Sequence, residues 1–165
     1  MKKLSVLFAA IIMFASMGLK AQKTATLDVT GILNAMPEKK KADTQLEAFQ
    51  TAKAAEIKKK TDAVQAVYER YQKESAAQSA EVNKTRQDEL QKMFEEVKKL
   101  EAAAQKELYE KQDAAFAPIE AKFNAAVKKA ALANNWEYVM DANSTSLVYK
   151  AGPDATPAVK KELGL

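Results

Sequence analysis

Side chains that could do covalent or metal chemistry are scarce in this sequence. It contains no histidine and no cysteine, which removes the commonest general base, the Ser-His and Cys-His nucleophile pairs, and the usual zinc ligands. The four glycines are at least twelve residues apart, so there is no glycine-rich phosphate loop. Carboxylates such as Glu95 and Glu96 are abundant, but nothing around them indicates a concave substrate pocket. The sequence therefore predicts neither an enzyme nor a bound cofactor or metal.

Non-covalent binding is the chemistry that remains, and its candidates are large apolar side chains outside the regular helix-packing positions. Four of them lie among lysines and glutamates, at Tyr68, Phe94, Tyr109 and Phe116. Flexible apolar side chains among charges suit weak binding to many different partners. The alternative for each is ordinary packing between two helices, and the sequence favours that alternative for any single residue.

The charge balance does not indicate nucleic-acid binding. The chain has 26 basic and 22 acidic residues, but Lys2, Lys3 and Lys20 lie in an N-terminal segment without acids, and the remainder holds 23 basic residues against 22 acidic ones. The lysine runs 39–41 and 58–60 are flanked by acidic residues, which is typical of solvated helix faces. We therefore expect no nucleic-acid partner, and charge does not indicate contact with a membrane.

Residues 1–21 have the three-part layout of a secretory signal peptide, with a basic start, an apolar run and a short polar end. The apolar run from Leu4 to Leu19 has 16 residues, fewer than the roughly 20 that span a bilayer. This argues against an uncleaved membrane anchor. Cleavage after Ala21 is preferred, and cleavage after Gly18 is the alternative. The pattern predicts export from the cytoplasm, with residues 22–165 as the mature chain.

A long helical stretch covers residues 38–134, which contain no glycine and one proline, Pro118. Apolar residues recur mostly three, four or seven positions apart and form one narrow seam. The seam disappears between Ser75 and Thr85. This predicts a turn there, with Thr85 capping a second helix; the alternative is one helix that runs straight through.

Reflection about residue 80 brings the two halves of the seam into register, which predicts an antiparallel helical hairpin. Pro118 removes one backbone hydrogen bond inside the second helix. It either bends the helix or is tolerated without a role.

Short strands are expected at the two ends of this hairpin. Residues 24–29, 136–140 and 146–150 show strand patterns. One helical turn is expected before Pro37, and a short helix from Thr156 to Leu163. The apolar strand residues have no sheet of their own to complete, which makes them candidate contacts between subunits: Leu27, Val29, Tyr138, Val139, Met140, Leu147 and Val148.

Three short segments resemble the Skp/OmpH family of periplasmic chaperones: Thr26-Leu27-Asp28-Val29, Tyr138-Val139-Met140-Asp141-Ala142-Asn143 and Asp154-Ala155-Thr156-Pro157. The resemblance implies an α+β fold, mostly helical, in which long helical hairpins hang like tentacles from a β-barrel shared by three chains. Residues 22–37 and 135–165 would then form the trimer, and residues 38–134 one arm.

The resemblance also implies an ATP-independent periplasmic holdase that binds unfolded outer-membrane proteins between its arms. Here the arm departs from the family's strongly basic pattern, since residues 38–134 hold 19 basic and 17 acidic side chains. A structural coiled-coil spacer or scaffold of the cell envelope is the alternative. The strands argue against it, because a spacer does not need them.

Overall fold

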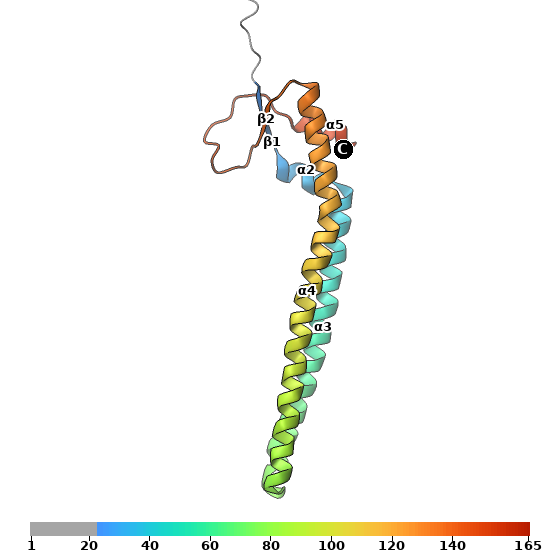
Figure 1. Cartoon of the computed structure of the whole chain (residues 1–165), viewed down its shortest axis with the longest axis vertical. Helices are drawn as coiled ribbons and strands as arrows, with labels where there is room; N and C mark the ends of the chain where they lie inside the picture. The colour runs from blue at the N-terminus through green and yellow to red at the C-terminus, as the bar shows by residue number, and fades with distance from the viewer. Residues whose placement is uncertain (1–22) are drawn as a thin grey trace, which may run out of the picture. The chain divides into compact units, whose positions relative to one another are not determined.

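The computed structural model describes residues 23–165, and the predicted signal peptide, residues 1–21, lies outside the described residues. The elements run in the order β1 (Thr24–Leu27), α2 (Val29–Ala35), α3 (Pro37–Glu74), a 3-10 turn (Ser75–Ala77), α4 (Ala80–Ala133), β2 (Tyr138–Asp141) and α5 (Thr156–Leu163) (Figure 1). A mostly helical chain with a two-stranded sheet in its described part confirms the predicted α+β class.

Contacts within the chain define two compact units. One, here called the arm, is Pro37–Ile119; the other, here called the head, comprises the described residues before Pro37 together with Glu120–Leu165. Helix α4 contributes residues to both units, and Pro118 lies inside α4 without ending it.

The arm is an antiparallel pair of helices, as the seam predicts (Figure 1). Pro37 is the first residue of α3, a position where the missing N–H is not needed for a helical hydrogen bond. Its buried seam residues are few and mostly small: Ala42, Val64, Val97, Ala104 and Ile119.

Cross-helix contacts confirm the predicted register. The pairs Lys53–Glu107, Tyr71–Glu89 and Glu74–Arg86 each join residues equidistant from position 80.

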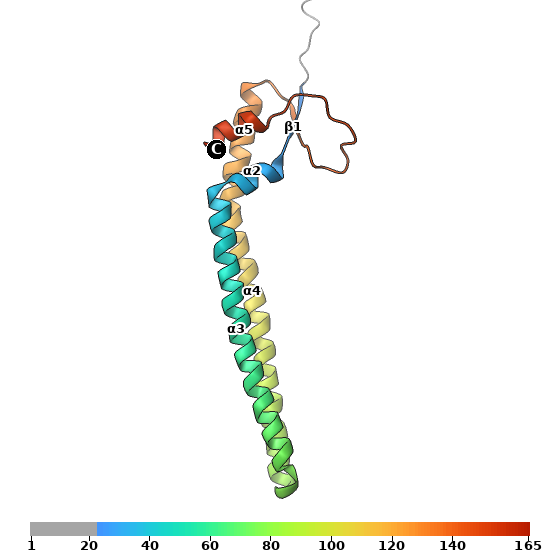
Figure 2. The ribbon, with the colours of Figure 1, turned by 180° about the vertical axis from the view of Figure 1, so that it is seen from behind.

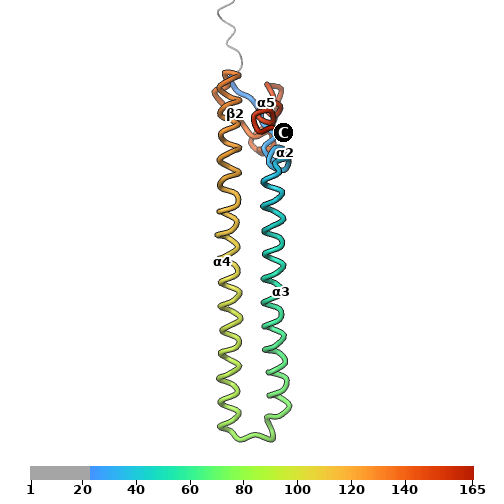
Figure 3. The backbone as a smooth tube through the Cα atoms, turned by 90° about the vertical axis from the view of Figure 1, so that its right-hand side faces the viewer, coloured from blue at the N-terminus to red at the C-terminus, as the bar shows by residue number. Residues whose placement is uncertain are grey.

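The turn between α3 and α4 lies where the seam disappears, and Figure 3 shows it joining the two helices. Helix α4 nevertheless begins at Ala80, earlier than predicted, because the Ser79 hydroxyl accepts a hydrogen bond from the Val82 N–H at 3.2 Å and caps the first turn. Thr85 is therefore not the cap. It lies inside the helix, and its hydroxyl donates to the Glu81 carbonyl at 3.1 Å.

A polar cluster holds this turn together without glycine or proline. The Arg86 guanidinium forms an ion pair with Glu74 at 2.5 Å and lies 4.5 Å from the centre of the Tyr71 ring. The Tyr71 hydroxyl donates to Glu89 at 2.5 Å, and the Asn83 amide donates to the Ser75 carbonyl at 2.9 Å. These contacts connect the last turn of α3 to the first turns of α4.

In the head, β1 is the central strand. It pairs in parallel with β2, with Thr24 opposite Tyr138 and Leu27 opposite Asp141. On its other side the Thr26 N–H donates to the Pro153 carbonyl at 2.9 Å, and the Thr26 carbonyl accepts from the Ala155 N–H at 2.7 Å.

The alternation predicted for β1 is confirmed, since Ala25 and Leu27 are buried while Thr24 is exposed. Helices α2 and α5 contact each other (Figure 2). The largest fully buried side chains of the head are Ile32 of α2, Met36 at the C-cap of α2, and Val159 of α5.

Two strand predictions are wrong in extent. β1 ends at Leu27, and Val29 is the first residue of α2, because the Asp28 carboxylate caps that helix. β2 begins at Tyr138 rather than residue 136, because α4 ends in a Schellman arrangement. There Asn135 takes a left-handed φ of 56°, and the Trp136 N–H donates to the Ala131 carbonyl at 2.9 Å.

The predicted strand at residues 146–150 is absent from the described chain. A strand requires a neighbouring backbone, and β1 already has a partner on each side. Residues 146–150 are not paired with β2, which leaves β2 with one unpaired edge within the described chain.

Asp28 lies where the three segments that carry the family resemblance converge. Its Oδ1 atom accepts hydrogen bonds from the Gly31 N–H and from the Asn143 amide, both at 2.9 Å. The Asp28 N–H donates to the Thr156 hydroxyl at 3.0 Å, and the Thr156 N–H donates to the Asp154 carboxylate at 2.9 Å. Helix α5 begins at Thr156, as expected, and Ala155 is its N-cap residue.

The surroundings of Asp28 favour its charged form. The hydrogen bond from the Gly31 N–H, followed by that from the Asn143 amide, lowers the pKa of Asp28 below its ordinary value. Partial desolvation opposes this shift, and the ammonium groups of Lys160 and Lys150 add to it. A lowered pKa in the folded state means that Asp28 stabilises the fold above its unfolded-state pKa, and that this contribution is lost as the pH falls through the folded pKa.

We expect Arg86→Ala to loosen the end of the arm, because it removes both the ion pair to Glu74 and the contact with the Tyr71 ring. The expected loss is about 1 kcal/mol of unfolding free energy, with faster amide exchange on both sides of the turn. Thermal unfolding and hydrogen exchange would measure this, with the exposed Lys84→Ala as the matched control. Equal exchange in the two variants would contradict the role of the cluster.

Asp28→Asn and Asp28→Ala should separate the charge of Asp28 from its hydrogen bonds. Asparagine keeps an Oδ1 acceptor. At pH 7 the melting temperature of the Asp28→Asn variant should therefore lie closer to that of the wild type than the melting temperature of Asp28→Ala does. The gap between wild type and Asp28→Asn should close as the pH falls below about 3.9, the ordinary pKa of aspartate. Thr30→Ala, exposed on the same helix, is the control, and a gap that does not change with pH would contradict the assignment.

Candidate functional site

Three of the four candidate binding residues of the arm are exposed rather than packed between the helices. Tyr68 is 40% exposed, Phe94 46% and Tyr109 58%. Phe116 is half-buried, and the Lys39 ammonium of the facing helix lies 6.0 Å from its ring centre. For this residue, packing between the helices describes its position better than free exposure.

The aromatic residues of α4 share one face of that helix. At 3.6 residues per turn, Phe94, Tyr109 and Phe116 fall within about one sixth of the helix circumference. The face lies beside the seam, which passes through Val97 and Ala104. Tyr68 belongs to α3, and the register about residue 80 brings it to nearly the same level along the arm as Phe94. These residues therefore form a discontinuous apolar strip along the arm.

A second candidate binding region of the arm lies around Phe49, a half-buried seam residue of α3 that is not among the four candidates chosen from the sequence. The ammonium groups of Lys53 and Lys111 lie 5.6 and 5.1 Å from the centre of its ring. Both lysines form ion pairs with Glu107, at 3.3 and 3.9 Å. The hydrogen bond from Lys53 to Glu107 is the main cause that raises the pKa of Lys53.

Two hollows flank Phe49 along the seam. One has a volume of about 300 Å³ and lies between α3 and the part of α4 that carries Ala104 and Leu108. The other has a volume of about 410 Å³ and lies against Ala114 and Ala115. The alanines at these α4 positions are the sequence signal for the hollows, because side chains of that size do not fill the space opposite Phe49.

The candidate subunit contacts of the head fall into two groups: residues that are at least half-buried in their own chain and residues that are exposed. Leu27 is buried within its own chain, and Val29, Val139 and Leu147 are half-buried. The others are open to solvent: Tyr138 is 65% exposed, Met140 43% and Val148 97%.

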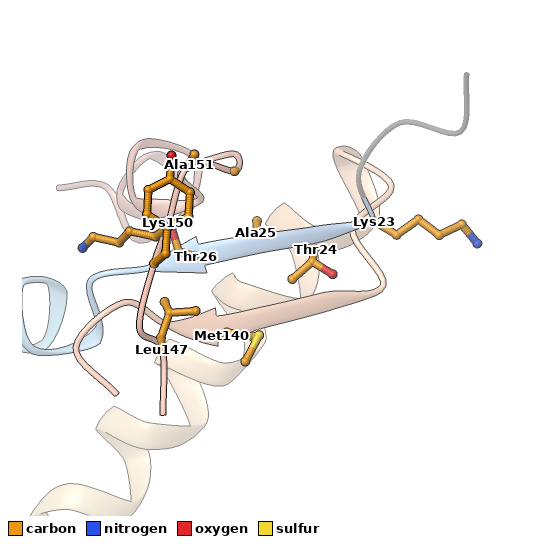
Figure 4. Close-up of a pocket in the computed structure, with 10 residues that line it drawn as sticks. Lys23, Thr24, Ala25, Thr26, Met140, Leu147, Lys150 and Ala151 are labelled. Carbon is orange, nitrogen blue, oxygen red and sulfur yellow. The ribbon is translucent and has the colours of Figure 1, made fainter. Parts of the chain in front are cut away.

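The outer face of the sheet borders a cavity of about 270 Å³ (Figure 4). Thr24 and Thr26 line it from β1 and Met140 from β2, and Leu147 and Tyr149 line it from the segment after β2. This part of the head presents an unpaired strand edge, exposed apolar side chains and an incompletely filled cavity together.

Two other kinds of feature are absent from the described residues. Among residues 23–165, no group of three or more histidine, cysteine, aspartate or glutamate side chains could hold a metal ion. None of the helices in that part of the chain combines the length and apolar character needed to cross a membrane.

Comparisons with known proteins give a consistent family assignment. No curated protein matches the chain. A crystal structure from Caulobacter crescentus CB15, described as a candidate outer membrane chaperone (OmpH-like), is similar in fold, with a TM-score of 0.71 and 16% sequence identity. The match covers 88% of this chain and 86% of that one. A family model described as outer membrane protein (OmpH-like) matches residues 23–163. This confirms the resemblance seen in the sequence, and the chain therefore belongs to the OmpH-like family.

Proposed function

We propose that the mature chain is an ATP-independent holdase chaperone of the periplasm. In this proposal a homotrimer binds unfolded outer-membrane β-barrel proteins between its helical arms and prevents their aggregation. The observation that carries the proposal is the exposed aromatic strip of the arm, in which Phe94 and Tyr109 stand open to solvent on one face of α4. Membership of the OmpH-like family, which includes a structure described as a candidate outer membrane chaperone, supports a chaperone role.

The strip suits a client without a defined shape. Single exposed apolar side chains are ordinary on protein surfaces, but several on one face of an isolated helix pair offer repeated weak contacts to an extended chain. The basic and acidic side chains of the arm nearly balance, so apolar contact rather than bulk positive charge supplies the attraction. A client held by many weak contacts leaves when it reaches a more favourable environment, and no nucleotide is needed for that step.

The open strand edge and exposed apolar side chains of the head support the proposed homotrimer. A two-stranded sheet is marginal in water, and here β2, which carries the exposed Tyr138, keeps an unpaired edge within the described chain. Val148, in the segment after β2, is exposed as well. Pairing with other copies of the chain would cover both the edge and these side chains. Residues 1–21, with the pattern of a signal peptide, support export to the periplasm.

Lysine at Tyr138 and Val148 should dissociate the trimer without unfolding its subunits. Both side chains are exposed in the single chain, so the charges are costly only where another subunit covers them. Val139 and Leu147 are less suitable positions, because they are half-buried in their own chain. Light scattering should give three chains for the wild type and one for the double variant.

The control for this experiment is Tyr109→Lys, an equally drastic change on the arm, which should leave the trimer intact. Circular dichroism must show unchanged helix in both variants. A wild-type protein that is monomeric at micromolar concentration, or a double variant that stays trimeric, would overturn the assignment.

Replacing Tyr68, Phe94 and Tyr109 together by serine should weaken client retention. The exposed rings contribute apolar area and little to the seam, so the arm should stay helical. We expect about a tenfold loss of affinity for a urea-unfolded outer-membrane β-barrel protein, measured by light scattering after dilution from urea.

The matched control is Leu132→Ser, which removes an apolar side chain that is 70% exposed in the head. Retention that falls equally in both variants, or in neither, would contradict a binding surface on the arm. A protein that suppresses no aggregation at all would favour the coiled-coil spacer.

A further inference from the structure

In the middle of the arm, the seam residues of α3 are not fully buried against α4. The buried seam residues of α3 are Ala42 and Val64, and the seam positions between them are only half-buried, including Leu46, Phe49 and Ile57. These larger residues face a part of α4 rich in alanine, so the two helices leave the hollows of about 300 and 410 Å³ on either side of Phe49.

Each hollow has room for a large side chain from another molecule. An enclosed cavity of about 150 Å³ holds a benzene ring; the two hollows are larger, at about 300 and 410 Å³, and open to solvent on one side. The walls are apolar: Phe49, Ile57 and Leu108 line the smaller hollow, and Leu46, Phe49 and Ala115 the larger one.

The cover over Phe49 can move without any change in the backbone. Lys53 and Lys111 lie over its ring and are held by Glu107. Both are long side chains with several rotatable bonds, and their ammonium groups can find water when displaced. Access to the hollows therefore requires side-chain rotation alone.

The rim of each hollow carries glutamine. Gln45 borders the larger hollow, and Gln50 and Gln105 border the smaller one. All three are exposed, and within the described chain their amides form no hydrogen bond. An amide side chain both donates and accepts, so it can pair with the N–H and C=O of a peptide backbone that has no partners of its own.

We propose that the two hollows beside Phe49 are client subsites that each take one large apolar side chain of an extended polypeptide, while Gln45, Gln50 and Gln105 bind its backbone. This rests on the proposed holdase function and adds a definite place on the arm to it. The occupant is an extended chain because it alone combines apolar side chains with unpaired backbone groups. A helix of a second copy has its backbone groups already bonded, and an alkyl chain would leave the glutamines unmatched.

Leucine at Ala104 and Ala115 tests the subsites by filling them. Ala104→Leu acts on the smaller hollow and Ala115→Leu on the larger one, and filling a hollow should raise the melting temperature of the arm. The same double variant should bind an unfolded outer-membrane β-barrel protein about tenfold more weakly. Greater stability with weaker binding is a combination that simple damage to the arm does not produce.

Ala102→Leu is the matched control, because Ala102 is an exposed residue of the same helix and borders neither hollow. It adds the same side chain and should leave binding unchanged. A second variant avoids any overpacking: alanine at Gln45, Gln50 and Gln105 changes only exposed side chains and should also weaken binding, whereas Gln72→Ala should not.

A labelled peptide, Gly-Ser-Thr-Phe-Thr-Ser-Gly, gives the most direct reading by fluorescence anisotropy. Wild-type protein should bind this phenylalanine peptide more tightly than a version in which alanine replaces phenylalanine. The leucine double variant should bind the two peptides equally. A preference that survives in the double variant would overturn the proposal. The proposal would also be overturned if a dodecyl detergent below its micelle concentration displaced the peptide and the glutamine variant had no effect on binding. That pair of results would assign the hollows to alkyl chains.

The two proposals can fail separately. A wild-type protein that does not retain the unfolded client overturns the holdase function itself. A wild-type protein that retains it, with unchanged retention in the leucine and glutamine variants, overturns only the subsites and leaves the exposed aromatic strip as the binding surface.

Discussion

A pair of helices in water can bury only one narrow stripe of each partner, and this constraint governs the arm. Every large apolar side chain outside the stripe remains open to solvent, as Tyr68, Phe94 and Tyr109 are. In a compact domain a third layer would cover them. Here the described part of the arm has no such layer, so surface that would otherwise serve stability is available for binding.

The same constraint explains why polar contacts determine how the two helices align. A seam with few buried residues, most of them alanine or valine, offers little shape to fix the pairing, and helices with such a seam could pair in several registers at similar free energy. The contacts of Lys53 with Glu107, and of Arg86 with Glu74, belong to one register only. The polar groups of the arm thereby specify which aromatic side chains stay in the seam and which stay outside it.

In the head, as in the arm, part of the structure lacks a covering partner within the described chain, and here that part is a strand edge. Its core is built on a few side chains from α2 and α5, and β1 has a partner on each side, but β2 ends the sheet with an open edge. Asp28, directly after β1, is joined by three hydrogen bonds to the first turn of α2, to the turn after β2 and to the start of α5. The head thus has a well-connected centre and one open strand edge within the described chain, and this edge is the observation on which the proposed association of chains depends.

The local signals in the sequence were sufficient to predict the helical hairpin. The apolar period, the loss of the seam near residue 80 and Pro37 at a helix start all act through neighbours in the chain. Such interactions are similar in any context, so the two arm helices and their register were confirmed. The residue types also marked the aromatic candidates of the arm before their surroundings were known.

Only the tertiary structure decided which of those candidates are open. Phe116 lies under Lys39 while Tyr109 is exposed, because apolar periodicity records the face of a helix and not what lies across from it. The parallel pairing of β1 with β2, the role of Asp28 and the absence of a strand at residues 146–150 all depend on partners more than a hundred residues away or on the lack of one. The hollows beside Phe49 likewise arise from two separate helices, since an alanine leaves a space only where the facing residue fails to fill it.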